Sequence, residues 1–228
     1  MGKSKVIAID GPSGSGKSTI ANNVAESLHL TYLDTGAMFR AIALTLDSRL
    51  ISSVDTTGIE QSLAKMKFEY QPSDSVLIQI DGKDLTEEIR QHHVSTLASQ
   101  FSQVPQIREF LKLKQREIAS EKASILEGRD IGTVIFPNAA LKIFLTARPE
   151  VRAKRRLEEL KTRSPNENYD LQKILADIVK RDQSDQNRSV APLVKADDAI
   201  EIDTSEMTIS EIVDQIVGLF NQNKKDFY

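Results

Sequence analysis

The chain has 228 residues, of which 39% are hydrophobic and 28% are charged, and its formal net charge at pH 7 is −3. These values are typical of a soluble globular protein that can bury a real core, and the slightly negative charge argues against a general nucleic-acid-binding protein. The sequence has no cysteine, which excludes disulfides, thiolate metal sites and a cysteine nucleophile.

The first apolar run, residues 6–9, is too short for a secretory signal, and no run approaches the length of a transmembrane helix. We therefore expect a cytoplasmic protein that works without a membrane.

Short β-rich runs alternate with longer helical patterns along the chain. Strands are predicted at residues 5–9, 31–33, 124–126, 141–145 and 199–202. Helices are predicted at about 17–29, 36–47, 91–102, 105–121, 149–161, 170–184 and 208–222. This alternation predicts a three-layer α/β fold with a five-stranded parallel sheet, whose functional loops follow the carboxyl ends of the strands.

Two segments depart from the alternation. Residues 67–70 and 76–80 have strand character and flank a predicted turn at 71–75, so we expect a small antiparallel insertion there. Residues 164–168 are polar and turn-rich and lie between two charged helices, which is typical of a linker or the tip of a flap.

A phosphate-binding motif follows the first predicted strand. Gly11, four further residues and then Gly16-Lys17-Ser18 satisfy the pattern G-x-x-x-x-G-K-[ST], at a strand–helix junction. Glycines let successive backbone N–H groups converge on a phosphate at the positive end of the next helix. Lys17 can reach the β- and γ-phosphates and the Ser18 hydroxyl can ligate Mg²⁺. The chain is predicted to bind a nucleoside triphosphate.

Three arginines stand beside turns at the predicted functional edge, namely Arg40, Arg129 and Arg188. Phosphoryl transfer needs several fixed cations around the migrating group, and guanidinium groups meet that need. The helix predicted at 149–161 and the residues after it carry further arginines, and surface charge explains some of these as well as function does: Arg152, Arg155, Arg156 and Arg163.

Four stretches of the chain closely resemble the bacterial cytidylate kinase family. They are IDGPSGSGKS from residue 9, LDTGAMFR from residue 33, EGRDIGTVIFP from residue 127, and RDQSDQNRSVAPL from residue 181. The resemblance extends from about residue 5 to 217. It implies a P-loop nucleoside monophosphate kinase fold in one domain, residues 1–228, with a core (1–35, 91–150 and 185–228), a nucleotide-monophosphate region with the insertion at about 36–90, and a helical lid at about 151–184.

The resemblance also implies an activity, the ATP-dependent phosphorylation of CMP and dCMP with Mg²⁺. The residues it assigns to the ATP phosphates are Gly11, Pro12, Ser13, Gly14, Ser15, Gly16, Lys17, Ser18 and Thr19, with Ser18 on the metal. Those it assigns to catalysis are Lys17, Arg40, Arg129, Arg156 and Arg188. On the acceptor side it assigns Arg40, Arg129 and Arg188 to the phosphate, Ser99, Arg108 and Asp130 to cytosine, Arg181 and Asp185 to the sugar, and Thr35 to substrate binding.

The chemistry of these residues agrees with the assignment. The N4 amino group of cytosine can donate to a carboxylate, and its N3 and O2 atoms can accept from Ser and Arg. The acceptor oxygen of CMP is already anionic, so no general base is needed, and Asp34 and Asp130 are expected to hold arginines, the base or metal-bound water. Thr35 and Phe39 depart from the Ser and Tyr expected in many relatives, and Phe39 thereby lacks a hydroxyl.

Three alternatives remain at this point. A GTP-dependent switch protein is suggested by the motif-like runs 55–58 and 223–226, although neither follows a convincing strand. A kinase for another monophosphate or small metabolite fits the same phosphate loop. A non-catalytic nucleotide-binding module is disfavoured by the number of arginines. We expect only small-molecule partners, no nucleic acid, and a monomer.

Overall fold

The computed structural model describes residues 2–71, 77–163, 165 and 167–227. Within these residues a larger sheet has five strands in the order β2-β6-β1-β7-β8 and a smaller one has three in the order β3-β4-β5. The larger sheet contains β1 (Ser4–Asp10), β2 (Thr31–Asp34), β6 (Ser124–Gly128), β7 (Ala139–Thr146) and β8 (Ile200–Asp203). The predicted five-stranded parallel sheet is confirmed.

By its internal contacts the chain divides into two compact units. The first unit comprises Met1–Leu30 and Ile125–Tyr228, and the second comprises Thr31–Ser124. The boundaries expected at about 36–90 and 151–184 stay predictions.

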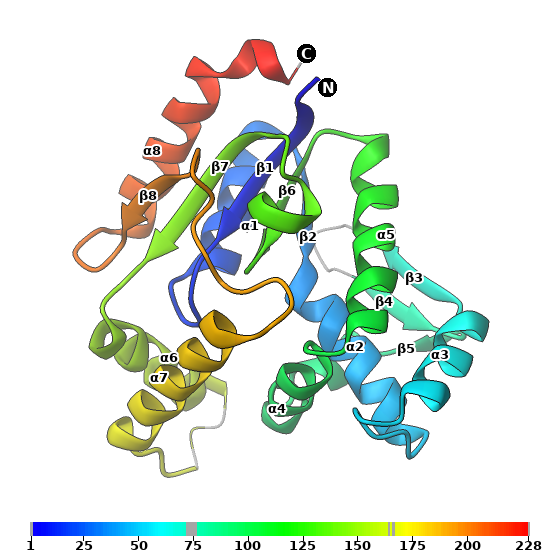
Figure 1. The fold of residues 1–228 in the computed structure, drawn as a ribbon. Coiled ribbons are helices and arrows are strands. Elements are labelled where there is room, and N and C mark those ends of the chain that lie inside the picture. The colour runs from blue at the N-terminus through cyan, green and yellow to red at the C-terminus, as the bar shows by residue number, and fades with distance from the viewer. Residues whose placement is uncertain (1, 72–76, 164, 166, 228) are drawn as a thin grey trace. The chain divides into compact units, whose positions relative to one another are not determined.

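The first unit is built around β1, which is nearly continuous in buried β-branched residues because both of its faces are covered. It pairs in parallel with β7, which in turn pairs in parallel with β8. Helix α1 (Lys17–Leu28) packs against β1 and against α8 (Ile209–Gln222), as Figure 1 shows. A π-helical turn, η2 (Ile131–Ile135), follows β6, and a 3₁₀ turn, η3 (Lys224–Asp226), follows α8.

Two long helices complete the first unit, α6 (Pro149–Arg163) and α7 (Leu171–Asn187), which pack against each other. Helix α7 extends three residues beyond its predicted end, so that Asp185 lies on the helix and Arg188 directly follows it. The predicted linker at 164–168 lies between these two helices, and its residues 164 and 166 lie outside the described residues.

The second unit contains the smaller sheet and most of the remaining helices. Its strands β3 (Phe68–Gln71), β4 (Leu77–Ile80) and β5 (Lys83–Asp84) pair antiparallel, which confirms the predicted insertion. Residues 72–76, which hold most of the predicted turn, lie outside the described residues. The helices are α2 (Thr35–Ser48), α3 (Thr56–Lys65), η1 (Glu88–Arg90), α4 (His92–Phe101) and α5 (Pro105–Glu121).

Helix α3 was not predicted from the sequence, where the run 55–58 was weighed only as a switch-like motif. In the structure the Asp55 side chain accepts a hydrogen bond from the Gly58 N–H at 2.9 Å and caps the start of α3. The motif-like run at 223–226 lies at the end of α8 and in η3, with no strand before it. No helix among the described residues is long and apolar enough to cross a membrane.

Candidate active site

The phosphate loop, residues 11–18, joins the carboxyl end of β1 to α1 in the first unit. A Cβ atom on Gly11 would lie 2.0 Å from the backbone oxygen of Leu145, so only glycine lets the chain pass β7 this closely. Gly14 and Gly16 have φ angles of 75° and 88°, in the left-handed region that favours glycine, and Gly16 is the N-cap of α1. The predicted loop geometry therefore has a local steric cause.

Lys17 is buried at the start of α1, with 5% of its surface exposed. Its Nζ donates a hydrogen bond to the Pro12 carbonyl at 2.8 Å, which places the ammonium group within the loop. Burial and the nearby Arg129 guanidinium lower the pKa of Lys17 to about 7. An anion that enters the loop would therefore stabilise the protonated form of Lys17.

Ser18 contacts a carboxylate that sequence analysis did not single out. Its Oγ donates to Glu127 Oε1 at 2.8 Å, and Glu127 is a buried residue of β6. A hydroxyl beside a carboxylate offers the hard oxygen donors that Mg²⁺ prefers. Among the described residues no group of three or more His, Cys, Asp or Glu could hold a metal ion.

Four predicted site residues of the first unit form one network of ion pairs. Arg129 Nε donates to Asp185 Oδ2 at 2.8 Å, and Arg188 lies 3.4 Å from Asp130 and 4.0 Å from Asp185. Burial opposes ionisation of Asp185, but the three nearby arginines Arg129, Arg181 and Arg188 hold its pKa below the ordinary value. The expectation that Asp130 holds an arginine is confirmed.

The arginines of α6 differ from one another in their surroundings. Arg156 is part-exposed and pairs with Glu159, one turn along the same helix, at 2.7 Å. Arg152 has 3% of its surface exposed, and it donates to the Ser13 and Ala147 carbonyls at 2.9 and 2.8 Å. It also forms a 2.7 Å ion pair with Asp182 of α7. Arg152 of α6 therefore contacts the phosphate loop. Sequence analysis left this arginine open between surface charge and function and did not place it among the site residues.

Asp10, the last residue of β1, is a second buried group that the predictions did not include. Its carboxylate accepts from the Ile131 and Gly132 N–H groups at 2.8 and 2.7 Å, which ties β1 to the turn that follows Asp130. Burial raises the pKa of Asp10 to about 6. Because Asp130 directly precedes this turn, Asp10 fixes the backbone beside it.

In the second unit, Asp34 and Arg40 stand at the start of α2. Asp34 Oδ1 accepts from the Ala37 N–H at 2.7 Å and caps the helix, while Oδ2 binds Arg40 Nη2 at 3.1 Å. A Cβ on Gly36 would lie 3.1 Å from Arg40 Nη1, so glycine leaves room for the guanidinium. This confirms the expectation that Asp34 holds an arginine.

Two of the three predicted base-reading residues, Ser99 and Arg108, belong to α4 and α5 of the second unit. Arg108 is buried, donates to the Ser102 carbonyl at 3.0 Å, and lies with its guanidinium carbon 5.5 Å from the centre of the Phe39 ring. Ser99 lies one turn before Ser102, whose hydroxyl donates to the Ser99 carbonyl. Thr35 is the buried first residue of α2. Phe39, whose missing hydroxyl was noted in the sequence, presents its ring to Arg108.

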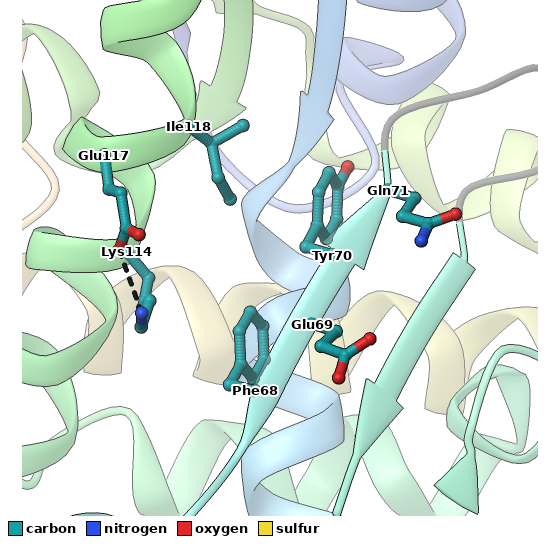
Figure 2. Close-up of a pocket in the computed structure, with 7 residues that line it drawn as sticks. All are labelled: Phe68, Glu69, Tyr70, Gln71, Lys114, Glu117 and Ile118. Carbon is teal, nitrogen blue, oxygen red and sulfur yellow. Dashed lines mark hydrogen bonds and ion pairs between the residues drawn. The ribbon is translucent and has the colours of Figure 1, made fainter. Parts of the chain in front are cut away.

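A cavity of about 270 Å³ lies between β3 and α5 in the second unit, and Figure 2 shows its seven lining residues. None of these seven is a predicted site residue, so no predicted binding or catalytic role involves the cavity.

The family model described as cytidylate kinase matches residues 7–222. A cytidylate kinase of Fervidobacterium nodosum is 47% identical over 216 residues, covering 95% of this chain and 96% of that protein. A cytidylate kinase of Clostridium tetani is 44% identical over 214 residues, covering 94% and 92%.

A bifunctional pantoate ligase/cytidylate kinase of Prochlorococcus marinus is 44% identical over 223 residues, which cover 97% of this chain and 44% of that protein. Among solved structures, a shikimate kinase from Bacteroides thetaiotaomicron has a TM-score of 0.48 and 12% identity, covering 95% of this chain and 98% of that one.

Proposed function

This chain belongs to the cytidylate kinase family, and we propose that it transfers the γ-phosphoryl group of ATP to CMP and dCMP. The observation that carries the proposal is the network of Arg129, Asp130, Asp185 and Arg188, which lies in the same unit as the phosphate loop. A module that only bound a nucleotide would not need several oriented guanidinium groups in addition to the loop lysine.

The phosphate loop binds ATP in this proposal. Backbone N–H groups of the loop and the start of α1 receive the phosphates, and Lys17 neutralises charge that develops on the transferring group. Ser18 and Glu127 would hold Mg²⁺ directly and through its hydration shell. The ion, when bound, stabilises the negative charge on the phosphate oxygens.

The acceptor nucleotide is bound by residues that the structure already orients. Arg40, Arg129 and Arg188 hold the phosphate of CMP, and we call them the acceptor arginines. Each is paired with a carboxylate, which fixes the plane of its guanidinium group.

Recognition of the rest of the nucleotide is assigned to six residues. Asp130 accepts from the cytosine amino group, and Ser99 and Arg108 face the remaining base edge. Arg181 and Asp185 contact the sugar, and Thr35 contributes its hydroxyl. Arg108 is suited to this role because the Ser102 carbonyl and the Phe39 ring fix its guanidinium.

Transfer needs positioning and charge stabilisation and no general base, because the attacking phosphate oxygen of CMP is ionised at neutral pH. Arg156 joins the lysine and the acceptor arginines around the migrating group. We also propose that the protein acts as a monomer in the cytoplasm, on small-molecule substrates and without nucleic acid.

A coupled assay tests the proposal with ATP, Mg²⁺ and a panel of CMP, dCMP, UMP, AMP and GMP. We expect the highest kcat/KM with CMP and dCMP. A clear preference for AMP, UMP or GMP would contradict the proposal, and so would selective binding of GTP with no transfer to CMP.

A further inference from the structure

The insertion sheet contributes a side chain to the start of α2. In β3, Phe68 and Tyr70 are buried whereas Glu69 and Gln71 are exposed, as the two-residue period of a strand requires. Figure 2 shows Phe68 and Tyr70 on the side of the strand that faces α5, with Glu69 and Gln71 on the other side. Phe68 packs edge-on against Phe110 of α5, with the ring centres 6.2 Å apart, which anchors the strand.

The Tyr70 ring packs on this apolar surface, and its hydroxyl makes a polar contact at the start of α2. Its Oη accepts a hydrogen bond of 2.9 Å from the backbone N–H of Asp34. Asp34 is the N-cap of α2, and its carboxylate binds Arg40. One hydrogen bond from β3 therefore fixes the residue that orients an acceptor arginine.

A comparison with α8 shows why α2 needs this partner. At α8 the N-cap Thr208 has its backbone N–H satisfied by Glu211, the third helical residue, in a capping box. At α2 the equivalent third residue is Ala37, which has no side-chain acceptor. Tyr70 supplies from another element the acceptor that Ala37 lacks.

We propose that Tyr70 is a positioning residue for the acceptor phosphate, acting through Asp34 on Arg40. The inference rests on the proposed function, in which Arg40 binds the phosphate of CMP. Without the hydroxyl, the Asp34 backbone loses a partner and its carboxylate holds Arg40 less firmly. Ser99 and Arg108, which are assigned to cytosine, belong to α4 and α5 and do not depend on this hydrogen bond.

The first experiment compares Tyr70→Phe with the intact protein in the coupled assay. We expect KM for CMP to rise about three- to tenfold, which is the range for the loss of one hydrogen bond. The KM for ATP stays unchanged. Tyr169→Phe is the matched control, since it removes the same atom from a hydrogen bond to Glu167 in the first unit. An unchanged KM for CMP in Tyr70→Phe would overturn the inference.

The second experiment separates positioning from general damage by measuring the binding of CMP and of cytidine by calorimetry. Cytidine lacks the phosphate, so Tyr70→Phe should weaken the binding of CMP and leave that of cytidine unchanged. In an Arg40→Met background the Tyr70→Phe change should have no further effect on CMP binding. Equal weakening of both ligands would mean a merely structural role and would refute the inference.

The proposed function and the role of Tyr70 are overturned by different results. If the intact protein does not phosphorylate CMP, the proposed function is wrong whatever Tyr70 does. If the intact protein does so and Tyr70→Phe behaves like Tyr169→Phe, only the inference about Tyr70 is wrong.

Discussion

Ser18 Oγ donates a 2.8 Å hydrogen bond to Glu127 Oε1 and so joins the phosphate loop to the carboxyl end of β6. The two residues are 109 positions apart in the sequence. The pair provides the hydroxyl and the carboxylate that an ion accompanying ATP would need from the protein.

Replacing Glu127 by Gln should raise the Mg²⁺ concentration that half-activates the enzyme. The amide removes a negative charge but keeps the shape, and loss of such a partner typically costs about 10- to 100-fold in metal affinity or activity. Titration of activity with Mg²⁺ at fixed ATP measures the effect. Glu117→Gln, which changes an exposed side chain of α5, is the control. An identical Mg²⁺ response in both variants would exclude the role of Glu127.

Removal of the Lys17 charge should lower kcat strongly. Lys17→Met preserves much of the buried stem but removes a charge-stabilising group, a loss that typically costs about 10²- to 10³-fold in kcat. Steady-state kinetics measure this, with Lys114→Met as the control. Turnover within about twofold of the intact protein would remove Lys17 from the mechanism.

The buried carboxyl of Asp10 should make stability depend on pH. Its pKa is raised from 3.8 to about 6 in the folded protein. Between these values the folded state keeps a proton that the unfolded state has lost, so this contribution to stability is present below pH 3.8 and is lost as pH rises through 6. A shift of this size corresponds to about 3 kcal/mol.

Urea unfolding of the intact protein and of Asp10→Asn tests the prediction, because the contributions of other carboxyl groups cancel in the difference. The stability of the intact protein relative to the variant should fall from pH 4 to pH 7. A difference that is constant or rises over this range would contradict the raised pKa of Asp10.

Arg152 should matter for both stability and ATP binding. Arg152→Met leaves the buried Asp182 carboxylate without its ion-pair partner, which typically costs about 3–5 kcal/mol. Arg148→Met is the control, because its ion pair is exposed and should contribute less than about 1 kcal/mol. Chemical denaturation measures both changes.

The milder Arg152→Lys separates the two effects, since it keeps the charge facing Asp182 but cannot reproduce all of the hydrogen bonds to Ser13 and Ala147. We expect KM for ATP to rise while KM for CMP stays close to that of the intact protein. A change in KM for CMP alone would be inconsistent with contact to the phosphate loop.

The parts of the site predicted from the sequence are those encoded in contiguous residues. The phosphate loop depends on glycines at fixed spacing, and the pairing of Asp34 with Arg40 spans six positions within one helix start. The sheet followed from the alternation of strand and helix patterns. Each of these has a local physical cause, which is why the sequence alone reveals it.

The residues that were missed depend on contacts between distant parts of the chain. Arg152 and Arg156 are the same residue type on one helix, and only the packing of α6 and α7 decides which of them is buried against Asp182. Glu127 was not singled out because its partner Ser18 is far away in the sequence. Tyr70 belongs to no motif, and its hydrogen bond to Asp34 exists only once the hairpin has formed.

The dependence of α2 on Tyr70 has a consequence for folding during synthesis. Tyr70 follows Asp34 by 36 positions. The start of α2 therefore lacks this acceptor until β3, the first strand of the hairpin, has been synthesised and has packed into place. Pairing between such distant residues forms later than local helical contacts do. The acceptor side of the enzyme should therefore acquire its final order late in folding, after the helix that carries Arg40 has formed.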